Sequence, residues 1–484
     1  MNTPLRRLAI VVVAMFVSLM AAATSVQFVQ AAKLNDDPRN VRTLYREFNN
    51  SRGPIIIAGE QVASSTKVDD AFKYQRTYTN GPLFAPVTGF YSVVYSRTGI
   101  ERAENDVLTG TADSLFLSRV QDLFTGRQPQ GSSVELTIDP AVQQAAWDAL
   151  GDQRGAVVAI DPATGAILAM VSKPTFDPNV LAGHSTSAVN EAYRVLNDDP
   201  AAPLLNRAIN ETYPPGSTFK LIDAAAALEG GMTPETQLAA PLTLPLPGSS
   251  KSISNFGGES CGPGATVSLA EALRVSCNTA FAQLGMDLGA DTLRSQAEAF
   301  GFDDPLQIPL TVTPSRFPAP PGPDAAQTAL SAIGQYDVRA TPLQMALVSA
   351  AIANGGKQMA PYLVQTVRNP DLEVVEEASP RELRTSVSAT TAAALRDMMI
   401  GVVENGSGKS ARISGVQVAG KTGTAQTTTD AAPHAWFTAF APADAPRVAV
   451  AVVVENGGSL GNEATGGQVA APIARAVIEA VLAR

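Results

Sequence analysis

The chain has 484 residues, of which 45% are hydrophobic and 17% are charged. This length exceeds what one hydrophobic core usually organises, so the sequence predicts two or more domains. A formal net charge of −10, without any basic run, argues against nucleic acid as a partner. The two histidines, His184 and His434, are too few for a metal cluster and argue against a Ser-His-Asp triad, so we expect no metal and no other cofactor.

The N-terminal segment is apolar. From Leu8 to Ala32 there is no charged residue, and a span of about 20 such residues crosses a bilayer as a helix. Arg6 and Arg7 precede the span, and positive residues stay on the cytoplasmic side. We therefore expect a cytoplasmic tail at residues 1–7, a transmembrane anchor at residues 8–30 and the rest of the chain outside. The alternative is a signal peptide that is cleaved after a small-residue site.

A serine and a lysine stand three residues apart in YPPGSTFKLIDAAAAL, residues 213–228. Two prolines and a glycine cannot continue a helix, so Ser217 is predicted at a helix start, with Lys220 on the same face. A serine needs an adjacent base to become a nucleophile. Lysine is that base only if its ammonium form is destabilised by about 4 kcal/mol. The pair alone is weak evidence, because Ser64 and Lys67 have the same spacing and an N-cap serine would look alike.

Two further motifs follow in the chain. VSCNTAF places Ser276 and Asn278 on either side of Cys277, and VAGKTGTA contains the run from Lys421 to Thr424. Serine-x-x-lysine, serine-x-asparagine and lysine-threonine-glycine in this order are the signature of penicillin-binding proteins and serine β-lactamases. The long separations between the motifs require a folded domain to gather them.

At this point the chain resembles the transpeptidases among the penicillin-binding proteins, over about residues 130–484. AVVAIDPATGAILAMVSKPTFDPN and IGQYDVRATPLQMA are also similar to segments of that family. A single anchor without a glycosyltransferase domain indicates class B, the monofunctional members. The resemblance implies a peptidoglycan D,D-transpeptidase that acylates a serine with stem peptides ending in D-alanyl-D-alanine, releases D-alanine and crosslinks cell-wall peptides. It also implies inhibition by β-lactam antibiotics, and partnership with a membrane lipid II polymerase and other cell-wall or divisome proteins.

The resemblance also assigns the catalytic residues. Ser217 is the expected nucleophile and Lys220 its base, while Ser276 lies between two lysines and relays a proton to the leaving amine. Asn278 is expected to bind the substrate's backbone amide and to hold Lys220 in place.

The remaining assignments concern substrate binding. Lys421 is expected to attract the terminal carboxylate and to depress the pKa of the first lysine. The hydroxyls of Thr422 and Thr424 receive that carboxylate, and Gly423 leaves room for a substrate strand along the sheet edge. The backbone N–H groups of Ser217 and Thr424 are expected to form the oxyanion hole.

These patterns predict an α+β fold in which helices pack on an antiparallel sheet, with a hairpin around Asp161–Gly165 and a C-terminal helix at about residues 470–482. The transpeptidase domain is expected at residues 131–484, after a turn-rich linker near residues 126–133. Residues 31–130 look like the family's non-catalytic pedestal or dimerisation domain. There, Arg52 and Gly53 match the usual arginine-glycine opening, but the acidic and basic residues that normally follow are missing.

Several alternatives stay open. A serine β-lactamase usually carries a glutamate that activates water, and no persuasive ExxN segment lies between the second and third motifs. A D,D-carboxypeptidase would use the same residues with water as acceptor. A β-lactam sensor or a non-catalytic septal scaffold would only bind. Cys261 and Cys277, the two cysteines, are expected outside the cell, where a disulfide is favoured over two free thiols.

Overall fold

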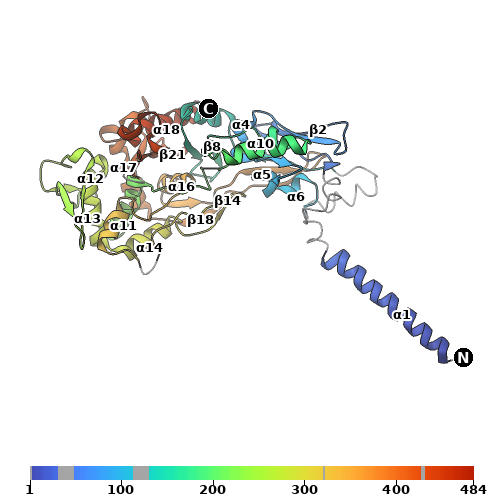
Figure 1. Ribbon diagram of the computed structural model, residues 1–484. Coiled ribbons are helices and arrows are strands. Elements are labelled where there is room, and N and C mark those ends of the chain that lie inside the picture. The colour runs from blue at the N-terminus through green and yellow to red at the C-terminus, as the bar shows by residue number, and fades with distance from the viewer. Residues whose placement is uncertain (1–2, 31–47, 113–129, 320–321, 427–430) are drawn as a thin grey trace.

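The computed structural model describes residues 3–30, 48–112, 130–319, 322–426 and 431–484. Figure 1 shows an elongated folded body, with helix α1 (Thr3–Thr24) standing apart from it. α1 continues into a π-helical turn, η1 (Ser25–Val29), and none of the residues in these two elements is buried. Together they form a 27-residue apolar span. This span fits the expected single-pass membrane anchor.

A five-stranded antiparallel sheet with the order β19-β20-β21-β7-β8 organises the larger part of the body. Its strands are β19 (Ala419–Ala425), β20 (His434–Ala441), β21 (Val448–Val454), β7 (Gly155–Ile160) and β8 (Ile167–Lys173). β7 and β8 form the predicted hairpin. β19 is an edge strand, so one of its sides pairs with no other strand of the sheet.

Both faces of this sheet are buried, which explains why β7 and β21 are unbroken apolar runs. On one face, alternate side chains of β21 such as Val450 and Val452 pack in a core with α8 (Pro140–Leu150) and the C-terminal helix α18 (Gly466–Leu482). On the other face, the intervening side chains of β21 pack against α16 (Pro342–Ala353). α16 is apolar and almost entirely buried, as a helix enclosed on all sides must be.

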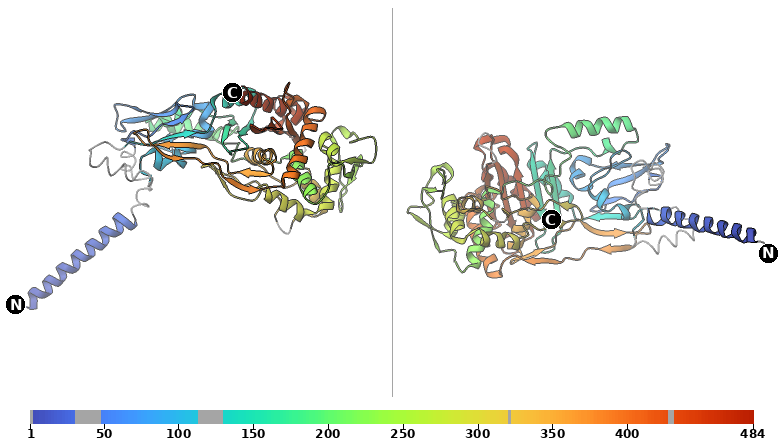
Figure 2. Two further views of the ribbon diagram at one scale, coloured as in Figure 1. Left: turned by 180° about the vertical axis from the view of Figure 1, so that it is seen from behind. Right: turned by 60° about the horizontal axis from the view of Figure 1, so that its bottom comes forward.

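A helical region lies next to β19, at the end of the body opposite the pedestal, as the two orientations in Figure 2 also show. Its helices are α11 (Lys220–Glu229), α12 (Leu269–Val275), α13 (Asn278–Leu288), α14 (Ala290–Ala299), α15 (Ala325–Ala332) and α17 (Ala389–Asn405). The three motifs meet between β19, the N-terminal ends of α11 and α13 and the C-terminal end of α12.

A second, six-stranded sheet has the order β17-β16-β6-β1-β2-β3. Its strands are β17 (Val374–Glu377), β16 (Val364–Arg368), β6 (Ser133–Leu136), β1 (Ile55–Ile57), β2 (Glu60–Lys67) and β3 (Tyr74–Tyr78). Its strands therefore come from both sides of the proposed boundary at residues 130 and 131, which stays a prediction. The first residues of the predicted linker lie outside the described residues.

Shorter elements complete the body. The helices are α4 (Gly81–Thr88), α5 (Gly99–Ala103), α6 (Asn105–Leu108), α9 (Asn179–Ala182) and α10 (Thr186–Asp198). Two-stranded pairs are formed by β4 (Tyr91–Ser92) with β5 (Ser96–Arg97), β9 (Gln237–Ala239) with β12 (Thr266–Ser268), β10 (Thr243–Pro245) with β11 (Ser252–Ser254), β13 (Leu306–Gln307) with β14 (Thr311–Val312), and β15 (Lys357–Met359) with β18 (Glu382–Thr385). Short 3-10 turns are η4 (Phe256–Gly258), η5 (Lys409–Ala411) and η6 (Glu455–Glu463).

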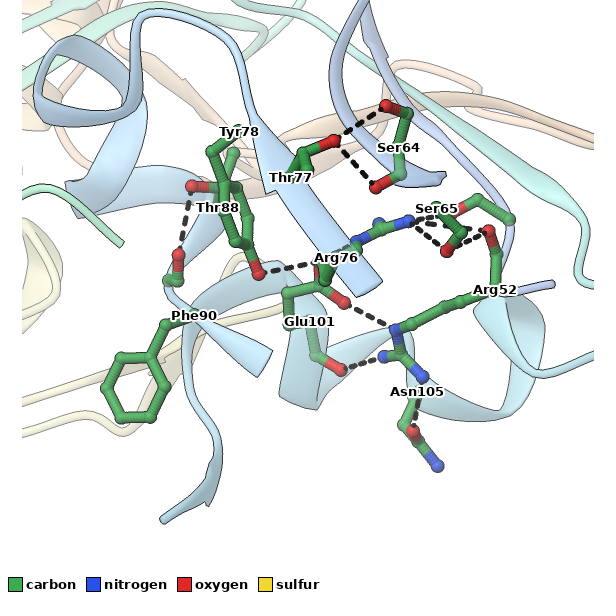
Figure 3. A network of polar contacts seen from close by, with 12 residues as sticks. Arg52, Ser64, Ser65, Arg76, Thr77, Tyr78, Thr88, Phe90, Glu101 and Asn105 are labelled. Atoms are coloured by element: carbon green, nitrogen blue, oxygen red, sulfur yellow. Dashed lines mark hydrogen bonds and ion pairs between the residues drawn. The ribbon is translucent and has the colours of Figure 1, made fainter. Parts of the chain in front are cut away.

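A buried ionic network holds the pedestal together (Figure 3). Glu101 on α5 accepts from Arg52 Nε at 2.5 Å and from Arg76 Nε at 2.6 Å, and Tyr78 donates its hydroxyl to the same carboxylate at 3.1 Å. Burial alone would raise the pKa of Glu101, but the two guanidinium groups outweigh burial and lower the pKa. The acid that partners Arg52 thus lies 49 residues along the chain.

Candidate active site

Ser217 lies on a 3-10 turn, η3 (Gly216–Thr218), and the α-helix α11 begins only at Lys220. The sequence predicted Ser217 at a helix start, and the structure places it on this turn directly before α11. The preceding prolines and Gly216, which has φ +54°, hold the chain in a tight turn at this helix start. A Cβ at Gly216 would lie 2.8 Å from the carbonyl oxygen of Thr424, so only glycine lets this turn press against β19.

Gly423 completes this close approach from the strand side. A Cβ on Gly423 would lie 2.9 Å from the carbonyl oxygen of Pro215 and 2.9 Å from Cβ of Trp436. The indole N–H of Trp436 donates to Pro214 O at 3.0 Å and ties the turn to β20. The room that Gly423 provides is filled by the serine turn, whereas the pairing of a substrate strand along the edge stays a prediction.

Lys220 is fully buried, and its ammonium nitrogen points at the second motif. Nζ donates to Ser276 O at 2.8 Å and to Asn278 Oδ1 at 2.8 Å, and lies 3.4 Å from Ser276 Oγ. Burial, and then the charge of Lys421, lower the pKa of Lys220 well below its ordinary value. Within the described part of the chain the Ser217 hydroxyl has no hydrogen-bond partner of its own.

Ser276 connects the two lysines, as expected. It ends α12 in the left-handed conformation with φ 62°, a conformation uncommon for residues other than glycine and frequent at functional sites. Its hydroxyl accepts from Lys421 Nζ at 2.8 Å, and Lys421 also donates to Thr422 O at 2.9 Å. Burial lowers the pKa of Lys421 to about 7. The structure thus gathers members of all three motifs around one serine hydroxyl.

The two threonines of the third motif share one face of β19, because side chains alternate along a strand. Thr422 is buried, and its hydroxyl lies 2.6 Å from the hydroxyl of Ser407. Thr424 is only half-buried, and its hydroxyl accepts from Gly466 N at 3.4 Å. Of the two hydroxyls, the one on Thr424 is therefore the more accessible to a substrate.

A second set of contacts fixes the Ser276 turn from behind. A disulfide joins Cys261 to Cys277, the pairing expected from their compartment. Asn255 Oδ1 accepts from the backbone N–H groups of Asn278 at 2.9 Å and Thr279 at 3.1 Å, which supplies partners for the first turn of α13. Asn255 was not predicted from the sequence, because it precedes its partners by more than 20 residues and carries no motif of its own.

Asp223, one turn after Lys220 on α11, was also missed. It is fully buried, and neither carboxyl oxygen has a hydrogen-bond partner among the described residues. Burial raises the pKa of Asp223 well above its ordinary value, although Lys220 acts in the opposite direction. A neutral carboxyl group next to a neutral lysine is the arrangement that this environment favours. Within the described ranges, no three acidic, cysteine or histidine side chains are grouped to hold a metal ion.

Comparison with known proteins agrees with this geometry. Residues 155–479 match the model of the penicillin-binding protein transpeptidase domain, and residues 52–134 match the penicillin-binding protein A dimerisation domain. The peptidoglycan D,D-transpeptidase PbpA of Mycolicibacterium smegmatis is 52% identical over 491 aligned positions, which cover 100% of this chain and 99% of the relative. PbpA of Mycobacterium tuberculosis is 50% identical with the same coverage.

A solved structure leads to the same family. The penicillin G acyl-enzyme complex of penicillin-binding protein A from M. tuberculosis superposes with a TM-score of 0.85 at 50% identity, covering 90% of this chain and 100% of that one. The predicted α+β fold and the predicted resemblance are both confirmed. The chain belongs to the penicillin-binding protein transpeptidase family, with a class B arrangement of dimerisation and transpeptidase domains.

Proposed function

We propose that this protein is a peptidoglycan D,D-transpeptidase whose nucleophile is Ser217. The observation that carries the proposal is the arrangement around Ser276, which receives hydrogen bonds from both buried lysines at 2.8 and 3.4 Å. The names of relatives at 50–52% identity, and the acyl-enzyme complex of one of them, support the same chemistry.

In the first half-reaction, Lys220 in its neutral form takes the proton of Ser217, and Oγ attacks the carbonyl carbon of the penultimate D-alanine. The N–H groups of Ser217 and Thr424 stabilise the oxyanion, a contribution of about 10²- to 10³-fold per donor in related acyl-transfer enzymes. The new C–O bond forms as the C–N bond to the last D-alanine breaks. Ser276 passes a proton to that leaving amine, and D-alanine departs.

Binding of the donor peptide uses the other members of the three motifs. Lys421 attracts the terminal carboxylate and Thr424 hydrogen-bonds it, while Thr422 is held by Ser407. Asn278 binds the peptide amide and keeps Lys220 in place. β-Lactams acylate the same serine as mimics of the donor.

In the second half-reaction, an amine of a neighbouring stem peptide attacks the ester carbon. The C–N crosslink forms as the ester C–O bond breaks, and Ser217 recovers its proton. Arg6 and Arg7 before the apolar span support a cytoplasmic N-terminus, with the catalytic domain outside the membrane beside its substrate. Partnership with a membrane lipid II polymerase and with divisome proteins belongs to the same proposal.

A two-substrate assay tests the function. The full chain in detergent is incubated with a D-alanyl-D-alanine donor peptide, with and without an acceptor amine, and products are followed by mass spectrometry. We expect crosslinked product together with stoichiometric D-alanine, and neither product from Ser217→Ala. Release of D-alanine with hydrolysed donor only, at every acceptor concentration, would replace the transpeptidase with a D,D-carboxypeptidase.

A further inference from the structure

Arg274 joins two helices at the edge of the active site. It lies in the last turn of α12, two residues before Ser276, and α12 packs against α17 (Figure 1). Its guanidinium donates from Nη1 to Asn405 O at 2.6 Å. Asn405 is the last residue of α17, so this carbonyl has no partner within its own helix. A cation at a helix C-terminus also interacts favourably with the helix dipole.

The guanidinium of Arg274 is held in one orientation. Glu271, one turn earlier on α12, accepts from Arg274 Nε at 2.6 Å and from Nη2 at 2.5 Å. Such a bidentate pair fixes the plane of the guanidinium. The two side chains are 34% and 32% exposed, so the pair itself adds little to folding stability. Its main effect is therefore to direct the third nitrogen of the guanidinium towards α17.

The backbone of Arg274 makes a second connection to the segment that follows α17. The N–H of Ser407 donates to Arg274 O at 3.2 Å. Gly406, between the two contacts, packs so closely that a Cβ on it would overlap with Arg274 O. Residues 405–407 are thus attached to α12 through both the side chain and the backbone of Arg274.

The same segment contacts the third motif on its other side. Ser407 Oγ lies 2.6 Å from the hydroxyl of Thr422 on β19. A Cβ on Gly467 would overlap with Ser407 O, so the first turn of α18 also fits tightly against this segment. Residues 405–407 therefore bridge β19 and the end of α12, which carries Ser276.

The conformation of Ser276 requires support from its neighbours. It has φ 62°, and residues other than glycine persist in this conformation only where their surroundings fix it. The disulfide of Cys277 and the contacts of Asn255 hold the residues that follow Ser276. Arg274 holds the residues that precede it. The two sets of contacts therefore fix both ends of the turn whose hydroxyl accepts from Lys421 at 2.8 Å.

We propose that Arg274 is a positioning residue for Ser276. Together with residues 405–407, it keeps the Ser276 hydroxyl where it can pass a proton to the leaving amine. Misplacing a catalytic group by about 1 Å can cost about 10²-fold in rate, so a loose α12 would slow this proton transfer. The inference rests on the proposed transpeptidase function and adds a residue that controls its proton relay.

Two donor peptides separate this role from a general loss of structure, on the full chain in detergent. One ends in D-alanyl-D-alanine, and in the other a sulfur atom replaces the scissile amide nitrogen, so that a C–S bond breaks. An amine leaves only with a proton, whereas a thiol, with a pKa of about 8.5, leaves as the thiolate. Attack by Ser217 and its base is common to both donors. Loss of the proton from Ser276 should therefore slow the amide much more than the thioester.

The measured quantity is the kcat/KM for the amide divided by the kcat/KM for the thioester. This ratio does not depend on the fraction of a variant that is folded. Ser276→Ala should lower it by about 100-fold, within the contribution of a general acid. We expect Arg274→Ala to lower it by about 10-fold, through kcat for the amide. Arg274→Lys keeps a donor for Asn405 O and should recover most of this loss.

Arg294→Ala is the matched control. Arg294 also pairs with an acid three residues earlier on its own helix, Asp291, and it also donates to a backbone carbonyl of a distant segment, Pro318 O at 2.7 Å. It lies on α14 and should keep the wild-type ratio.

An unchanged ratio in Arg274→Ala, together with a lowered ratio in Ser276→Ala, overturns the positioning role and leaves the transpeptidase standing. An equal fall of the ratio in Arg294→Ala and Arg274→Ala overturns it as well. An unchanged ratio in Ser276→Ala overturns the relay through Ser276, and the role of Arg274 with it. A wild-type protein that releases product from neither donor and takes up no penicillin overturns the proposed function itself.

Discussion

The buried carboxyl group of Asp223 gives a quantitative prediction. In the folded protein, burial raises its pKa well above the ordinary value of a carboxyl group, whereas in the unfolded chain the group ionises near that ordinary value. As pH rises above the unfolded pKa, the unfolded state loses a proton that the folded state keeps. Folding stability therefore falls with rising pH, by about 1.4 kcal/mol per pH unit for this one group.

The perturbation is Asp223→Asn, which keeps the shape and cannot ionise. Its free energy of unfolding relative to the wild type should rise with pH above the unfolded pKa, for as long as Asp223 stays protonated in the folded protein. An unpaired buried amide costs about 1–3 kcal/mol, but this cost does not vary with pH, and the carboxyl group it replaces is equally unpaired. The slope against pH is therefore the diagnostic quantity.

Urea denaturation of both proteins at several pH values measures this slope. Asp291→Asn is the matched control, because the Asp291 side chain is 97% exposed, and its curve should run parallel to the wild type. A constant difference between Asp223→Asn and the wild type from pH 5 to pH 7 would refute the reasoning. It would show that Asp223 is ionised in the folded protein beside a charged Lys220, which is then unable to act as the base.

Two further predictions concern other buried charges. Glu101→Gln should destabilise the protein by about 3–5 kcal/mol in urea denaturation, because Arg52 and Arg76 stay buried without their carboxylate; a loss below about 1 kcal/mol would contradict this. Lys421→Ala removes the second cause that depresses the pKa of Lys220, so the acid limb of the pH profile for penicillin acylation should move to higher pH. A lower rate with an unmoved limb would assign Lys421 to carboxylate binding alone.

The residues that the structure gathers around Ser276 were predictable, because acyl transfer demands particular side chains at short spacings. Ser217 and Lys220 lie one turn apart, and a serine hydroxyl that bridges two lysines followed from the second and third motifs. The effect of Lys421 on the pKa of Lys220 was also predicted, whereas the complete burial that lowers the pKa of both lysines was not. Asp223 and Asn255 were not predicted either, because the burial of one and the contact of the other with a distant segment are encoded by no local pattern.

The pedestal shows the same limit in the fold. Strand propensity and turn residues indicated short β-segments in residues 31–130, but not their partners. β16 and β17 enter that sheet from residues 364–377. Likewise, Glu101 pairs with Arg52 across 49 residues. No residue next to the arginine-glycine pair therefore indicates this partner in the sequence. Such pairing depends on the register of distant strands, which is set only when the whole sheet forms.

The central claim is that Ser217 is the residue that becomes acylated. Intact-mass spectrometry of the full chain after incubation with penicillin G, on the wild type and on Ser217→Ala, tests it most directly. We predict that the wild type gains the mass of one drug molecule in a long-lived adduct, and that Ser217→Ala gains none. An adduct of equal yield in Ser217→Ala, or no adduct in the wild type, would contradict the account.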